Sequence, residues 1–235
     1  MIVGDLIRWA RMNREFWRER WEANQIGFHE AHPNRWLRRF GARLLRAGAQ
    51  QSSEPRVLVP LCGKATDLVW LSQHGFRVTG IELIERAVRA FFQENRLAAQ
   101  SIRQGTHERL ESDRIAIWIA DIFELPGELL GSFEAIYDRA ALVALPEDVR
   151  PRYARRLTSL LVPGGRMLLV TFHYDPAIMK GPPFSVGEAE VRRLFDGAGT
   201  LERLADEDII EAEPRFKERG LTWLREQAWL FEKSG

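Results

Sequence analysis

Gly63 and Glu82 have the residue types and the spacing of a nucleoside-binding corner. In the segment 57–67 (VLVPLCGKATD), an apolar run leads into a glycine-centred turn, and a helical pattern opens at Lys64. A buried strand, a tight glycine turn and a helix N-terminus form the ligand-facing corner of a doubly wound α/β fold. The next predicted strand (77–81) is followed by Glu82, nineteen residues after Gly63. This spacing suits a carboxylate that binds the two hydroxyls of a ribose.

The phosphate-binding versions of this corner fit the sequence badly. There is no G-x-G-x-x-G motif. The Gly63-Lys64 pair lacks the upstream glycine of a Walker loop, where Leu58 stands, and Ala65 replaces its Ser or Thr. A ribose site without a phosphate site points to S-adenosylmethionine, a nucleoside that carries no phosphate.

Two acidic positions follow later predicted strands. Asp121-Ile122 comes after strand 115–119, where an Asp can accept from the adenine amine and an aliphatic side chain can cover the ring. A helix N-cap is an equally good account of this Asp. Asp138-Arg139 ends strand 133–138, at the edge of the sheet where ligands bind, and a surface ion pair is the alternative there.

Cysteine and histidine offer little for catalysis. Cys62 has no accompanying His and Asp or Asn pattern, so we expect a small buried thiol rather than a nucleophile. His29 and His32 lack a third ligand nearby in the sequence, so we expect solvated or capping histidines and no metal.

Composition limits the partners. The chain has 235 residues, a net charge of +1 with interspersed acids and bases, and one cysteine. Nothing in this pattern favours nucleic acid or membrane as a partner, and internal disulfides are excluded. With no secretory apolar region and no apolar run near 18 residues, we expect a cytoplasmic protein, acting as a monomer.

The elements alternate between strand and helix, which predicts a mostly parallel sheet. The predicted strands are 56–60, 77–81, 115–119, 133–138, 166–172, 200–210 and 222–232. The predicted helices are 13–23, 33–47, 64–74, 84–98, 147–161 and 187–197. We expect one domain, in which residues 1–50 form an N-terminal helical extension packed on residues 51–235. The long loop 173–185 follows a strand end and is either a covering loop or a surface connection.

Seven motifs in order resemble the thiopurine S-methyltransferase family, and its bacterial branch most. They are FWRERW (16–21), QIGFHE (25–30), VLVPLCGK (57–64), IELIERAV (81–88), DRAALVAL (138–145), TFHYDP (171–176) and GPPFSV (181–186). The resemblance implies a class I methyltransferase, with a Rossmann-like seven-stranded sheet whose last strand is antiparallel. It also implies an N-terminal helical lid over S-adenosylmethionine, which becomes S-adenosylhomocysteine.

The resemblance also implies roles for individual residues. The turn Leu61-Cys62-Gly63 would approach the methionine part of the cofactor, and Asp121-Ile122 would hold the adenine. Arg139 would face both cofactor and acceptor, and Arg215, in EPRFKERG, would face the acceptor. A fixed guanidinium favours an acceptor anion, so both arginines are the expected catalytic residues.

The aromatic residues Trp17, Trp21 and Phe28 are spaced to lie on one helix face. That face packs on the core or, as the resemblance implies, covers the cofactor and, at Phe28, the acceptor. His173, at the end of a predicted strand, is the one competitor as a general base.

The expected reaction is methyl transfer to the sulfur of small aromatic or heterocyclic thiols. Methylation of selenium or tellurium species is an alternative that the resemblance leaves open. Two rivals are an NAD-linked oxidoreductase on the same scaffold, against which the missing G-x-G-x-x-G counts, and a non-catalytic nucleoside-binding protein.

Overall fold

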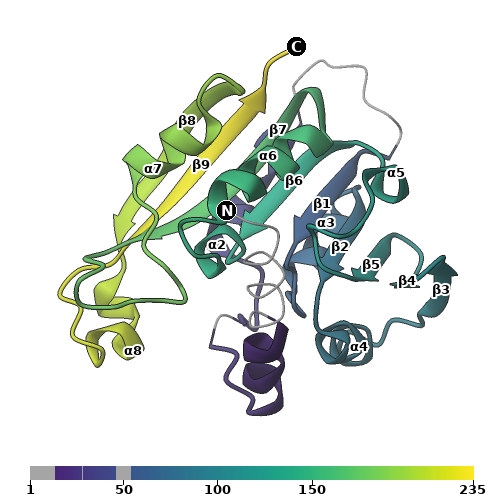
Figure 1. Cartoon of the computed structure of the whole chain (residues 1–235), viewed down its shortest axis with the longest axis horizontal. Coiled ribbons are helices and arrows are strands. Elements are labelled where there is room, and N and C mark those ends of the chain that lie inside the picture. Colours follow the sequence, from purple (N-terminus) through teal and green to yellow (C-terminus); the bar gives the residue numbers. More distant parts are fainter. Residues whose placement is uncertain (1–13, 28, 46–53) are drawn as a thin grey trace.

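The central feature of the fold is one mixed β-sheet. The computed structural model describes residues 14–27, 29–45 and 54–235. Within these residues, nine strands form a sheet in the order β3-β4-β5-β2-β1-β6-β7-β9-β8 (Figure 1). The strands are β1 (Arg56–Pro60), β2 (Arg77–Glu82), β3 (Gln100–Gln104), β4 (His107–Glu111), β5 (Ile115–Ile119), β6 (Phe133–Arg139), β7 (Leu161–His173), β8 (Gly199–Asp208) and β9 (Arg225–Lys233).

The pairing confirms the doubly wound prediction. Strands β5, β2, β1, β6 and β7 pair in parallel, while β9 is antiparallel to both β7 and β8. All seven predicted strands are present. The sheet has two more, because β3 and β4 add an antiparallel hairpin beside β5. Their sequences, QSIRQ and HERLE, are largely polar and β3 is mostly exposed, so no apolar run marks them.

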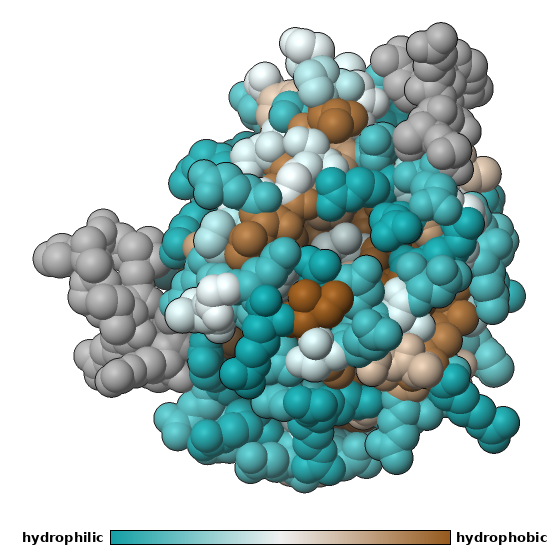
Figure 2. Space-filling model, turned by 90° about the vertical axis from the view of Figure 1, so that its right-hand side faces the viewer, coloured by the Kyte–Doolittle hydropathy of each residue, from teal (hydrophilic) through white to brown (hydrophobic). Residues whose placement is uncertain are grey.

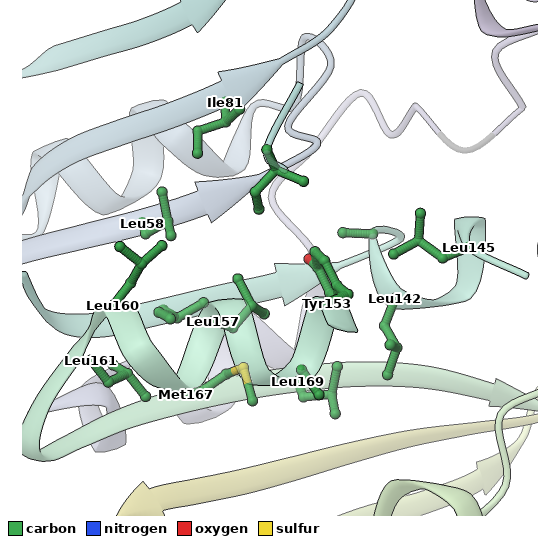
Figure 3. Close-up of a cluster of buried hydrophobic side chains, with 14 of the residues drawn as sticks. Leu58, Ile81, Leu142, Leu145, Tyr153, Leu157, Leu160, Leu161, Met167 and Leu169 are labelled. Atoms are coloured by element: carbon green, nitrogen blue, oxygen red, sulfur yellow. The ribbon is translucent and has the colours of Figure 1, made fainter. Parts of the chain in front are cut away.

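Helices cover both faces of the sheet. They are α2 (Arg35–Phe40), α3 (Asp67–Gln73), α4 (Glu85–Glu94), α5 (Gly127–Leu130), α6 (Arg150–Leu160), α7 (Glu188–Phe195) and α8 (Pro214–Lys217), with short turns η1 (Gly41–Leu44), η2 (Leu142–Ala144) and η3 (Ile210–Ala212). Helices α5, α6 and α7 pack on one face and α2, α3 and α4 on the other. Because side chains alternate along a strand, β1 serves both cores: Leu58 faces the first, Val57 and Val59 the second. Figure 3 shows the first core, where Tyr153, Leu157 and Leu160 of α6 point toward the sheet.

Two local predictions are corrected by backbone geometry. The helix after β1 begins at Asp67 rather than at Lys64, because Leu61 (φ 47°) and Gly63 (φ 53°) are in the left-handed region and the turn needs more residues. The segment Pro163–Gly165, expected from the sequence as the turn between helix 147–161 and strand 166–172, lies inside β7, where the pairing with β6 shifts register, and Gly164 has φ 73°.

The face of the molecule seen in Figure 2 is mainly hydrophilic. Figure 2 shows teal residues over most of one face, with smaller brown patches between them. Among the described residues, Ile178 is the one exposed large hydrophobic side chain. None of the helices in those residues is long and apolar enough to cross a membrane.

Candidate active site

A cavity lies at the carboxyl edge of the parallel strands. Its volume is about 280 Å³, and residues at or just after the ends of β1, β2, β5, β6 and β7 line it. The lining residues are Trp17, Arg20, Trp21, Gln25, Gly27, Leu61, Ile81, Glu82, Leu83, Ala120, Asp121, Ile122, Phe123, Arg139, Ala140, Val143, Ala144, Leu145, Phe172, Pro182, Pro183, Arg215, Phe216 and Arg219. This is the edge where open α/β sheets bind their ligands.

Backbone strain marks the centre of this edge. Leu61 follows β1 with φ 47°, and Ala140 follows β6 with φ 62°. Strands β1 and β6 are neighbours at the point where the strand order reverses direction. Non-glycine residues in the left-handed region cost roughly 1–3 kcal/mol and cluster at functional sites. Both residues line the cavity, so the strain lies where the fold places a ligand.

Glu82, at the end of β2, is 7% exposed and braces the first turn. One carboxylate oxygen accepts the backbone N–H of Gly63 at 2.8 Å, and the other accepts that of Ile84 at 2.8 Å. Burial raises the pKa of this carboxyl, and the backbone bonds oppose that rise. Gly63 is not in the lining, so the structure brings Gly63 to the site through its bond with Glu82.

Asp121 and Ile122 follow β5, next to β2 in the sheet. Ile122 is buried in the lining. Asp121 is half-buried, and its Oδ1 accepts the N–H of Phe123 at 2.8 Å. This bond closes a turn and does not cap a helix, because the next helix begins only at Gly127, so the N-cap alternative is wrong. Burial also raises the pKa of the Asp121 carboxyl. The turn bond engages one oxygen of a carboxylate that also lines the cavity, so this bond is compatible with ligand binding.

Asp138 and Arg139 do not form the surface ion pair that was the alternative. Asp138 is fully buried and accepts the hydroxyl of Tyr153 at 2.8 Å and the N–H of Leu142 at 3.1 Å. Burial raises its pKa to about 6. The Arg139 side chain is 10% exposed, forms an ion pair with Glu30 and lines the cavity. Adjacent residues thus point apart, one into the core and one into the site.

Arg215 links helix α8, late in the chain, to the segment around Gly27, early in the chain. It lies in α8, its Nε donates to Glu213 at 2.9 Å, and its Nη1 donates to the carbonyl of Gly27. Its guanidinium carbon is 4.9 Å from the ring centre of Phe216. Gly27 and Phe216 also line the cavity, so Arg215 reaches the same site as Arg139 although 76 residues separate them in the sequence.

The helix spanning 14–22 supplies Trp17 and Trp21 to the lining. Trp21 is 6% exposed and packs with Ile84 and Ala87, and Trp17 lies against the same cluster. Both tryptophans therefore have two roles: they pack against residues that follow β2, and they line the cavity. In Figure 1 this helix is dark purple, at the bottom of the view. Phe28, the third predicted aromatic, lies outside the described residues.

The predicted competitors as catalysts lie elsewhere. Phe172 lines the cavity, and its neighbour His173 instead contacts the Trp223 ring, with ring centres 5.2 Å apart. Cys62 is buried, as expected, and burial raises the pKa of its thiol well above the usual value. Burial and the charge of Lys64 lower the pKa of His29, while His32 is exposed. No group of three or more His, Cys, Asp or Glu suited to a metal occurs in the described ranges.

Sequence reasoning missed several residues of the lining. Arg20 lies three residues after Trp17 and one before Trp21, so helical periodicity alone could have placed it on the same face. Arg219 follows Arg215 by four residues and lies just beyond α8. Pro182 and Pro183 come from the loop after β7, which therefore contributes to the site. Glu30, the partner of Arg139, gave no signal beyond its place in the QIGFHE motif.

Comparisons with known proteins agree with this geometry. The family model for thiopurine S-methyltransferase matches residues 12–234. A thiopurine S-methyltransferase of Pseudomonas fluorescens (strain SBW25) is 44% identical over 218 residues, covering 93% of this chain and 98% of the relative. One of Nitrosospira multiformis is 40% identical, covering 93% and 97%.

Solved structures support the fold. A Burkholderia thailandensis 1,6-didemethyltoxoflavin-N1-methyltransferase with bound S-adenosylhomocysteine has a TM-score of 0.63 at 20% identity, covering 97% of this chain and 90% of that one. The N-methyltransferase NodS of Bradyrhizobium japonicum, also with S-adenosylhomocysteine, has a TM-score of 0.56 at 16% identity, covering 86% and 89%. The sheet order, the motifs and the family match over 12–234 agree, and the chain belongs to the thiopurine S-methyltransferase family.

Proposed function

We propose that this protein transfers the methyl group of S-adenosylmethionine to the sulfur of small aromatic or heterocyclic thiols. The observation that carries the proposal is the distribution of charge around the cavity. Glu82 and Asp121 line it from β2 and β5, whereas Arg139 and Arg215 line it from β6 and α8. The acidic side suits a ribose, an adenine amine and a sulfonium cation, and the basic side suits an acceptor anion.

The residues present fit the cofactor. Two carboxylates, two tryptophans and aliphatic side chains line the cavity, which suits a phosphate-free nucleoside with a cationic sulfur. Bound there, S-adenosylmethionine supplies an electrophilic methyl group on a positive sulfur. Glu82 would accept ribose hydroxyls while it holds Gly63 and Ile84 in place. Asp121 and Ile122 would hold the adenine, and Leu61 would contact the methionine part.

The arginines act on the acceptor. A guanidinium beside the thiol favours the thiolate, and because it stays protonated it does not quench that anion. The thiolate forms its new bond to carbon as the carbon–sulfonium bond breaks, which yields a thioether and S-adenosylhomocysteine. Alignment of the two sulfur atoms supplies much of the rate, so the protein needs no covalent intermediate.

The proposal also covers the N-terminal lid, the oligomeric state and the cellular compartment. Trp17 and Trp21 cover the cavity as part of an N-terminal extension (1–50) on the 51–235 domain. The oligomeric state that we propose is a monomer. A cytoplasmic setting agrees with the free, buried Cys62.

The test is a panel of acceptors with methyl-labelled S-adenosylmethionine. Aryl thiols and thiopurines should take up label on sulfur, and matched phenols and anilines should not. A Glu82→Gln variant should bind S-adenosylhomocysteine more weakly by roughly 1–3 kcal/mol, because an amide cannot accept all the bonds a carboxylate accepts. Tight binding of the cofactor with no label on any thiol would refute the proposal.

A further inference from the structure

The four arginines of the cavity differ in whether their charge is already balanced. Arg139 is paired with Glu30, and Arg215 is paired with Glu213. The other two are Arg20 and Arg219, and the lining has only two acidic side chains within the described residues, Glu82 and Asp121. Both of these lie on the side of β2 and β5.

The Nε of Arg20 is a buried donor for which the described part of the chain offers no acceptor. Arg20 lies on the helix 14–22 between Trp17 and Trp21, and its Nε is buried without a hydrogen-bond partner among the residues that the structure describes. Its guanidinium carbon is 4.5 Å from the ring centre of Phe16, which supports the side chain from one side. A buried N–H without an acceptor costs roughly 1–3 kcal/mol, so its position in a cavity lining points to a ligand atom that accepts from it.

Arg219 presents a second cation from a different part of the chain. It follows α8 and is exposed, and across the described ranges its guanidinium forms no hydrogen bond or ion pair. It lies close enough to Tyr174 to act on it electrostatically, and the Tyr174 hydroxyl donates to the carbonyl of Pro183. Arg219 thus lines the same cavity as Pro182 and Pro183 of the loop after β7.

The cofactor cannot balance both charges. S-adenosylmethionine brings one carboxylate against two cationic groups, an α-ammonium and a sulfonium, and an acceptor thiolate brings one further negative charge, which the proposed function assigns to Arg139 and Arg215. We propose that the acceptor carries an acidic group in addition to its sulfur, a carboxylate on an aromatic or heterocyclic thiol, and that Arg20 and Arg219 bind this group. This inference rests on the proposed function and names the acceptor class of the same site.

The two arginines should contribute unequally to the binding of the acidic group. Arg20 and Arg219 come from the covering helix and from the chain after α8, so an acid between them is bound from two sides. Exposed ion pairs contribute little and hydrogen bonds to a charged group contribute more, so Arg20, with its buried Nε, should matter more than Arg219. The benefit is greatest for substrate affinity, since both residues bind a part of the acceptor that does not react.

The test compares 4-mercaptobenzoate with 4-methylbenzenethiol, at a pH where both thiols are ionised. The wild type should prefer the carboxylated thiol in kcat/KM. This preference should fall about tenfold in an Arg20→Gln/Arg219→Gln double variant, mainly through KM, and partly in each single variant. Arg20→Lys and Arg219→Lys should retain part of it. Arg103→Gln, which changes an exposed arginine on β3, should retain all of it.

Calorimetry with S-adenosylhomocysteine checks that each variant is folded and loads the cofactor. An unchanged preference in the variants, equal losses for both thiols, or a loss of cofactor affinity in Arg219→Gln would overturn the inference. Methylation of both thiols without preference by the wild type would overturn it and leave the proposed function standing. Methylation of neither thiol would count against the proposed function itself.

Discussion

Replacing Asp138 with Asn should make the protein more stable at neutral pH and should remove part of its pH dependence. Asp138 is fully buried, and its pKa is raised from 3.8 to about 6, first by burial, while the bonds from Tyr153 and Leu142 oppose the rise. Above pH 6 the folded protein therefore holds the charged Asp138 carboxylate away from water. In the unfolded chain the same charge is exposed to water. Asn keeps the shape, can accept from Leu142 with its oxygen and can donate to the Tyr153 oxygen with its amide.

The sign and size follow from linkage. The folded pKa lies above the unfolded one, so the folded protein binds more protons between pH 3.8 and about 6, and its stability falls as pH rises through this window. A shift of this size corresponds to about 3 kcal/mol. The stability of Asp138→Asn relative to wild type should therefore rise by roughly 2–2.5 kcal/mol from pH 4 to pH 7, which is most of the full effect, and stay level above.

Urea unfolding at a series of pH values measures this difference. Part of the wild-type dependence should remain in the variant, because burial also raises the pKa of Asp67 to about 6. Asp113→Asn, which changes an exposed carboxyl, is the matched control and should follow the wild type. The reasoning would be refuted if the free energies of unfolding of Asp138→Asn and wild type changed in parallel with pH. It would also be refuted if the stability of the variant relative to wild type were lower at pH 7 than at pH 4.

Three further predictions concern the site. Arg139→Ala should lower kcat/KM for a thiolate acceptor by about tenfold or more, because the site loses a cation. The unpaired Glu30 is a second possible cause, and the double variant Arg139→Ala/Glu30→Gln tests it: kcat/KM should stay low in this variant. Trp17 and Trp21 should change fluorescence when S-adenosylhomocysteine binds, and helix 14–22 should gain protection from amide exchange; full protection without ligand would contradict a closing lid. His173→Gln should leave the pH profile of kcat/KM following the acidity of the thiol, because His173 contacts Trp223 outside the lining; a profile lost in this variant would show that the protein supplies the base.

Much of the fold was predictable because its signals are local. Buried parallel strands such as IAIWI (115–119) are continuous apolar runs, and their order along the chain with intervening helices determines a doubly wound sheet. The hairpin β3–β4 escaped prediction because an edge hairpin with exposed residues has no such run. The start of α3 was misplaced because left-handed residues at Leu61 and Gly63 are a property of the turn as a whole, and leucine gives no sign of it.

The site was predictable where a side chain follows a strand end. Glu82, Asp121 and Arg139 all come at or just after the carboxyl ends of parallel strands, and the fold brings such positions together without further information. Sequence could not show that Glu82 also braces Gly63, because this bond depends on the three-dimensional turn.

The charge balance of the arginines in the cavity could not be predicted from the sequence, for a different reason. Whether an arginine is available to a ligand depends on which carboxylates reach it. Arg139 and Glu30 are 109 residues apart in the chain and meet only in the folded protein. Arg20 and Arg219 sit among many exposed arginines of the same type, and only their place in the lining distinguishes them. The difference between a balanced and an unbalanced cation is therefore tertiary information, and the acceptor preference that we propose depends on it.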